Sequence, residues 1–373
     1  MGRRSGQDVR SIRVFALMEL GWVRIDFLES MGIVKTARKE ADSLALARAL
    51  LRNEPLPVDS ERFVELARLN KVVLRTASQL KIPSSVRSDA KDGAVEAWQL
   101  FDKMSRAFEE RGIPFVVIKS FDSLPDIGHD LDFLIPSSSE FRKAKDLLVN
   151  DYAVRAQDLT HCDKLVGKFS CYLPKFVHDF EIYPTISQLG EKYLAPEDVL
   201  KHRRKERVNG REVWLTSQVD GVLIRVIHAM YRHNALKLSD ILDFANMTRD
   251  CPTDEIIQGI EKTGTQDAFL YYLSTVQRVL EACNVDFPHV TALKLKAERN
   301  FGRDRLRLLG RDRLVLPYRI PLSPLVLVFL FKAARDVARG RLGSAVRCLV
   351  APPLVLLNFV NALSRDRLLK KVW

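Results

Sequence analysis

The amino-acid sequence predicts an α+β fold, in which a small mixed β-sheet is flanked by N- and C-terminal helical regions. Two observations predict this class. Apolar residues recur at helical spacing before residue 113 and after residue 216. Between these limits, short apolar runs alternate with polar turns and one helical segment. We therefore divide the 373 residues into an N-terminal helical region (1–112), a core (113–216), a helical domain (217–293) and a basic, apolar C-terminal tail (294–373).

The N-terminal region has its clearest helical pattern between residues 94 and 112. One apolar stripe there comprises Ala97, Leu100, Phe101, Met104 and Phe108. Gly112 is expected to end this helix. The segment 82–93 contains Pro, Ser, Asp and Gly, and it is expected to be a loop between helices.

The core begins with a stretch from Ile113 to Pro136 around which the rest is organised. Phe115–Ile118 is an apolar run that favours a buried strand, and a polar loop follows from 119 to 128. A second strand is expected to carry Asp130 and Asp132. A helix is expected after Ser137, and further strands at 152–155, 164–172 and 175–183, the last two forming a hairpin.

Paired carboxylates are the chemical signal of this core. Residues two apart on a strand share a face, so Asp130 and Asp132 point the same way. Like charges this close repel unless a cation lies between them, and Mg²⁺ or Mn²⁺ takes carboxylate oxygens. A second pair, Asp179 and Glu181, has the same spacing on a later strand. Either could supply a third acid, which would permit a two-metal site that binds a triphosphate and stabilises a leaving pyrophosphate.

This pattern resembles the nucleotidyltransferase superfamily related to DNA polymerase β. There a strand, a small-residue turn and a helix precede a strand with Asp-x-Asp, and a third acid follows. Here Ile118-Lys119-Ser120 stands at the turn, and the two acidic pairs follow. The chain is most similar to uncharacterised nucleotidyltransferases with a Leu-Lys-Gly turn, a later helix with a His and a Leu-x-Asp helix. In this chain Val222–Ala229 and Leu238–Phe244 are similar to those helices, and the resemblance covers roughly residues 60–250.

The resemblance implies a metal-dependent enzyme that moves a nucleotidyl group from an NTP to an unidentified acceptor. Asp130, Asp132 and Glu181 would be catalytic and would bind Mg²⁺ or Mn²⁺, with Asp179 as a further ligand. Lys119 and Ser120 would contact phosphate.

Two alternatives stay open. One is a glycosyltransferase, because a DxD pair also binds a metal and a nucleotide-sugar diphosphate; that class needs a larger α/β domain before the pair. The other is a noncatalytic regulator of the toxin–antitoxin type that keeps the fold. Ser120 favours this second alternative, because the family pattern has Gly after Lys, and Gly permits a close backbone approach to phosphate.

Net charge separates the tail from the rest of the chain. Residues 294–373 hold 18 Lys and Arg against 5 Asp and Glu, which leaves 41 basic and 42 acidic residues before them. Three functions of the tail are considered: a helical hairpin packed on the core, an anionic membrane surface bound through residues 316–373, or nucleic acid. Nucleic acid is the least favoured, because the tail is aliphatic rather than aromatic. Five cysteines without CxxC spacing indicate the cytoplasm.

Overall fold

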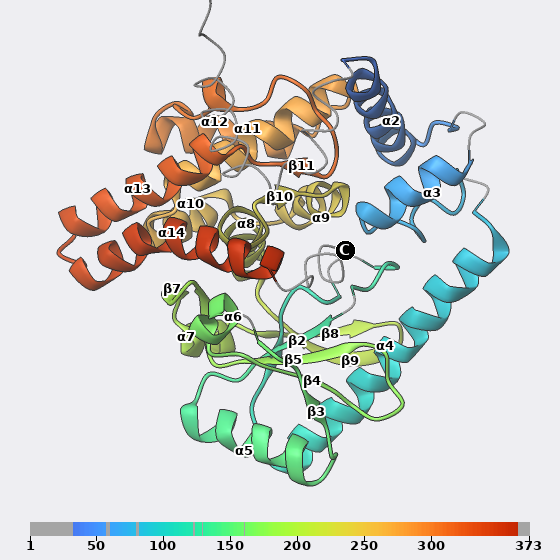
Figure 1. Cartoon of the computed structure of the whole chain (residues 1–373), viewed down its shortest axis with the longest axis vertical. Coiled ribbons are helices and arrows are strands. Elements are labelled where there is room, and N and C mark those ends of the chain that lie inside the picture. The colour runs from blue at the N-terminus through green and yellow to red at the C-terminus, as the bar shows by residue number, and fades with distance from the viewer. Residues whose placement is uncertain are drawn as a thin grey trace, which may run out of the picture.

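The α+β class is confirmed by a computed structural model, which describes residues 33–56, 60–79, 82–121, 124–128, 130–159 and 161–364 (Figure 1). Parts of the predicted N-terminal region and tail lie outside these residues. The helices are α2 (Ile33–Arg52), α3 (Ser60–Leu69), α4 (Ser84–Glu110), α5 (Ser138–Asn150), α6 (His161–Val166), α7 (Pro196–Lys201), α8 (Gln218–Ile227), η1 (His228–His233), α9 (Leu238–Arg249), α10 (Thr253–Thr263), α11 (Gln266–Ala282), α12 (Pro288–Phe301), η2 (Arg307–Leu309), α13 (Leu322–Ala338) and α14 (Leu342–Ser364).

A mixed sheet forms the centre of the molecule. Its strands, in spatial order, are β3 (Arg155–Ala156), β4 (Phe169–Tyr172), β5 (Asp179–Tyr183), β2 (Asp130–Leu134), β1 (Val116–Val117), β9 (Arg211–Leu215) and β8 (Arg204–Val208). β2 is parallel to β5 and antiparallel to β1. Two further pairs are β6 (Ile186–Gln188) with β7 (Glu191–Leu194), and β10 (Ala235–Leu236) with β11 (Tyr318–Arg319).

The two faces of the sheet differ in chemistry because side chains alternate along each strand. Leu131, Phe133 and Phe180 point to one face, where they pack with apolar residues of α4 and α5. Asp130 and Asp132 point to the other face, toward the C-terminal helices. The sheet therefore lies between a hydrophobic core that it forms with α4 and α5 and, on its other face, a layer that receives its carboxylates.

The largest hydrophobic core joins the two ends of the described chain. α2 and α3 contribute Leu46, Phe63 and Val64 to a cluster that is built mostly from residues of α8 to α14. α4 contributes instead to the core under the sheet. With 27 residues, α4 is about 40 Å long, and it connects the helical layer to the far side of the sheet (Figure 1).

Several local predictions were wrong. The expected loop at 82–93 is helical, because α4 begins at Ser84 directly after Pro83, and its polar first turns are largely exposed. Residues 164–166 belong to α6 rather than to a strand. The hairpin of β8 and β9 was not among the predictions, although its turn is formed by Asn209 and Gly210, with φ of 48° and 79°, a dipeptide typical of hairpin turns.

The C-terminal segment forms an α13–α14 hairpin that packs on the rest of the molecule. Apolar side chains of α13 and α14, among them Val328, Phe329 and Cys348, are buried in the large core. Pro352 and Pro353 lie inside α14. Among the described helices, none combines the length and apolar character that crossing a membrane requires.

Candidate metal and phosphate site

Three carboxylates meet on the polar face of the sheet. Parallel pairing of β2 and β5 places Asp130 beside Asp179 and Asp132 beside Glu181. Ligand oxygens of Asp130, Asp132 and Glu181 all lie within 4.8 Å of one another. Asp132 and Glu181 are 3% and 5% exposed, so the protein keeps two charged groups out of water at one place.

Asp132 has one neutralised oxygen and one free oxygen. Its Oδ2 lies 3.0 Å from Nζ of Lys119. Its Oδ1 is buried and has no hydrogen-bond partner among the described residues. A buried carboxylate oxygen without a partner is costly, so this atom is suited to bind a cation.

The electrostatic surroundings shift the pKa values of the two aspartates in opposite directions. Burial would raise the pKa of Asp130, but the positive charges of Lys71, Lys119 and Arg232 hold it below its usual range. Burial raises the pKa of Asp132 to about 6; Lys119 opposes that rise, and the charge of Asp130 adds to it. Asp130 therefore ionises first, and the two groups titrate as a pair.

Glu181 is the most strongly bound of the three acids. Its Oε1 accepts hydrogen bonds from Lys168 at 2.6 Å and from Ser170 at 2.9 Å, and its Oε2 accepts one from Tyr183. Burial opposes ionisation, but Lys168 lowers the pKa of Glu181 below its ordinary value. Glu181 is thus held as a charged, fixed group beside the aspartates.

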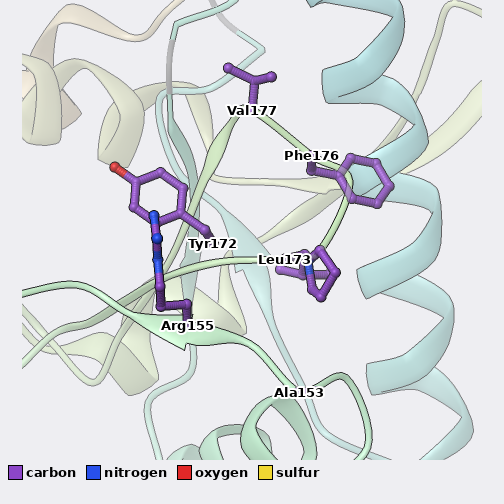
Figure 2. Close-up of a pocket in the computed structure, with 7 residues that line it drawn as sticks. Ala153, Arg155, Tyr172, Leu173, Phe176 and Val177 are labelled. Carbon is purple, nitrogen blue, oxygen red and sulfur yellow. The ribbon is translucent and has the colours of Figure 1, made fainter.

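Asp179, the other candidate for the third acid, does not join this cluster. Its carboxylate hydrogen-bonds the hydroxyl of Tyr172, with which it pairs across β4 and β5. Tyr172 borders an open groove of about 480 Å³ at the sheet edge, where Arg155 lies over its ring (Figure 2). The groove is lined by Ala153, Arg155, Tyr172, Leu173, Pro174, Phe176 and Val177. It therefore presents aromatic and aliphatic surface and one guanidinium, but no carboxylate.

A tight turn places Lys119 at the site. Lys119 has a φ of 66°, and the N–H of Ser120 donates to the carbonyl of Ile118 at 2.8 Å, which closes a three-residue turn. The Ser120 hydroxyl accepts from the N–H of Asp132 at 2.9 Å. Both polar groups of Ser120 are therefore engaged within the protein, and a phosphate contact through either would require these bonds to open.

Basic side chains from distant segments surround the acids. Lys71 follows α3, Lys168 precedes β4, and Arg232 lies on η1, and all three act on Asp130. Nε2 of His228, also on η1, lies 3.2 Å from Nζ of Lys119. Short π-helices such as η1 occur often at functional sites, because the extra residue redirects side chains.

From the sequence, no role in the site was assigned to these basic residues; His228 entered only within the stretch Val222–Ala229. Lys168 was found only as part of an expected strand, and Lys71 and Arg232 had no motif around them. The neighbouring residue Asn70 positions Lys71. Asn70 Oδ1 accepts a hydrogen bond from the N–H of Leu238 at 2.9 Å, and its Nδ2 donates one to the carbonyl of Leu316 at 3.3 Å. No local sequence pattern predicts such a long-range contact.

Asp126, in the loop before β2, has a structural role. Its two carboxylate oxygens accept from the N–H groups of Leu74 and Arg75 at 2.7 and 3.0 Å. It is 8% exposed, although loop carboxylates are normally on the surface. Asp126 thereby holds the segment after Lys71 against the loop that leads into the site.

The residues fit a divalent metal. Oxygen atoms of carboxylates are the donors that Mg²⁺ and Mn²⁺ prefer, and the unpartnered Oδ1 of Asp132 supplies one of them. Asp130 is the partly exposed member of the cluster. Glu181 already accepts three hydrogen bonds, so the two aspartates are the principal donors, with Glu181 behind them.

A second acidic cluster has a different character. Glu191, Asp336 and Cys348 also lie close together, and all are buried. Here the amine of Lys332 takes the place of a cation, at 3.1 Å from Glu191 and 2.6 Å from Asp336. This cluster is an ion-pair network that joins α13 to β7.

Comparison with known proteins gives one match. The family model described as "Uncharacterised nucleotidyltransferase" matches residues 57–281, which include the whole seven-stranded sheet and the helices up to nearly the end of α11. No curated protein and no solved structure matches the chain.

Proposed function

The chain belongs to the uncharacterised nucleotidyltransferase family, and on that premise we propose that it transfers a nucleotidyl group from an NTP to an acceptor hydroxyl or phosphate. The observation that carries the proposal is the buried, unpartnered oxygen of Asp132 beside Asp130, with basic side chains around both. Such a site attracts a metal cation and a polyphosphate together, because each neutralises the excess charge that the other would leave.

In this proposal, Asp130 and Asp132 bind Mg²⁺ or Mn²⁺, and Glu181 is the third acid. The metal would bind phosphate oxygens and neutralise charge that develops on the leaving pyrophosphate. Lys119 contacts phosphate, for which its position beside Asp132 is suitable. The contribution of Ser120 is to hold that turn, and Asp179 remains a neighbour rather than a ligand.

Lys168 and Tyr183 complete the proposed site by fixing Glu181. Lys168 balances its charge, and burial with the nearby charge of Asp132 keeps the pKa of Tyr183 well above its ordinary value, so the phenol stays a donor. Positioning and charge neutralisation are what phosphoryl transfer mainly requires of a protein. The buried free thiols at Cys171, Cys251 and Cys283 support a cytoplasmic setting for this chemistry.

One observation bears on the alternatives. A nucleotide-sugar glycosyltransferase needs an α/β domain before the DxD pair, whereas the described residues before β1 form helices and turns. This disfavours that class. A noncatalytic regulator remains the competing proposal, and it would retain the sheet and lose turnover.

The test is a panel of the four NTPs with Mg²⁺ or Mn²⁺, with release of pyrophosphate as the readout and mass spectrometry to identify the acceptor in a lysate fraction. We expect Asp130→Asn with Asp132→Asn to abolish metal-dependent turnover. Asp179→Asn is the matched control, because it changes a neighbouring carboxylate outside the cluster, and it should retain activity.

A nucleotide-dependent thermal shift separates the outcomes. Binding without turnover in the wild type would support the noncatalytic alternative. Turnover that survives in the double variant at the wild-type rate would refute the site assignment.

A further inference from the structure

The outer face of the α13–α14 hairpin is unusually apolar. Seven of the fourteen large apolar side chains exposed among the described residues lie on it, so the exposure is concentrated rather than scattered. On α13 they are Leu322, Leu330 and Val337; on α14 they are Leu342, Val346, Leu349 and Val350. Their exposed fractions range from 40% to 64%.

These side chains point outward because the opposite faces of both helices are anchored. Val328, Phe329 and Cys348 are buried in the large core. The ion-pair network of Lys332 fixes the same inner faces, since Lys332 and Asp336 are 1% and 0% exposed. α13 and α14 lie side by side at the edge of the molecule, so their outward faces form one surface (Figure 1).

The charges on the hairpin have one sign where they meet water. The exposed charged residues of the described part are Arg339 and Arg347. The only carboxylate of α13, Asp336, is buried against Lys332, and the described part of α14 has none. An outward apolar face on helices whose own exposed charges are all arginine is complementary to anionic headgroups over acyl chains.

From this arrangement we infer that the α13–α14 hairpin binds the surface of a membrane that contains anionic phospholipid. The bound hairpin lies along the headgroup boundary with its Leu and Val side chains directed into the acyl region. The face holds no exposed aromatic residue among those described, whereas protein interfaces are enriched in Tyr, Trp and Phe. Its composition therefore favours lipid over a protein partner, and the inference is independent of the proposed reaction.

The test is flotation of the full-length protein with vesicles of phosphatidylcholine alone or with about 30 mol% phosphatidylserine. We expect the protein to float with the anionic vesicles and to stay at the bottom with the neutral ones. Leu330→Glu combined with Val346→Glu should lower binding about tenfold or more, because both charges enter the apolar face. Leu295→Glu is the matched control, since Leu295 is 50% exposed on α12, and it should bind like the wild type.

Thermal unfolding of each variant checks that the fold is kept, and light scattering reports the oligomeric state. If the wild type fails to float with anionic vesicles, the inference is overturned. It is equally overturned if the folded double variant floats as well as the wild type. A wild-type dimer that does not float, and that the double variant converts to a monomer, would assign the face to a second copy of the chain.

Discussion

Replacement of Ser120 by Ala is expected to weaken the site through the backbone of Asp132. In a regular antiparallel ladder the N–H of Asp132 would donate to the carbonyl of Ile118, but the turn at Lys119 directs that carbonyl to the N–H of Ser120. The Ser120 hydroxyl takes the vacated place at 2.9 Å. Ser120→Ala therefore leaves a buried N–H without an acceptor.

The expected loss is about 1–3 kcal/mol in the free energy of unfolding, the cost of an unsatisfied buried donor. Urea unfolding of wild type and variant measures it. Ser120→Gly, which installs the residue of the family pattern, should cost at least as much, because the same hydroxyl is removed.

Ser105→Ala is the matched control for this prediction. Ser105 is 8% exposed, close to the 7% of Ser120, and its hydroxyl donates to the carbonyl of Phe101 in the same helix. Its removal orphans no donor, so the free energy of unfolding should change by less than about 0.5 kcal/mol. Equal losses in the two variants, or no loss in Ser120→Ala, would refute the reasoning.

Two further predictions concern buried lysines. Lys332→Met leaves Glu191 and Asp336 without the amine between them. The free energy of unfolding, measured in urea, should fall by about 3 kcal/mol, the lower end for a broken buried ion pair. The loss stays at the lower end because two arginines still contact the carboxylates. Burial and the charge of Lys71 lower the pKa of Lys237 to about 8. The unfolded chain then holds a proton that the folded protein releases between about pH 8 and 10, so stability should rise across that window by about 1–3 kcal/mol relative to Lys237→Met.

Each lysine prediction has a comparison that can contradict it. Lys262→Met is the control for Lys332, because the Lys262 side chain is 76% exposed and should contribute less than about 0.5 kcal/mol. For Lys237, parallel stability curves of wild type and Lys237→Met from pH 7 to 9.5 would contradict the lowered pKa.

The strand that carries Asp130 and Asp132 was predictable from the sequence, because its signal is local. A period of two places Asp130 and Asp132 on one face, and the apolar residues between and after them identify the buried face. The choice between Asp179 and Glu181 was not predictable. The two acids are two residues apart on the same strand, so they face the same way. They differ in their partners: Lys168 contacts Glu181, whereas Tyr172 contacts Asp179.

The basic residues of the site were not predictable for a related reason. Lys71 and Arg232 come from segments far apart in the chain. Lys71 follows Asn70, which bonds the N–H of Leu238, and Arg232 donates to the hydroxyl of Tyr183, so tertiary contacts rather than local motifs bring them to the site. The turn at Asn209 and Gly210 differs, since an Asn-Gly dipeptide is a strong local signal of a hairpin. A packed helical hairpin was one of the three possibilities considered for the tail. Lys332 is buried in that hairpin, and the amino-acid composition of the tail does not indicate that a lysine would be buried.

The hydrophobic cluster that α2 and α3 share with α8 to α14 has a consequence for biosynthesis. Its members range from Leu46 to Ala351, so this core cannot be completed until nearly the whole chain has left the ribosome. The sheet and its covering helices, in contrast, end at Leu215 and can assemble earlier. Between assembly of the sheet and completion of the large core, the apolar faces of α2 and α3 have no helices to pack against. The nascent chain would therefore depend on chaperones at its N-terminus, long after that end is synthesised.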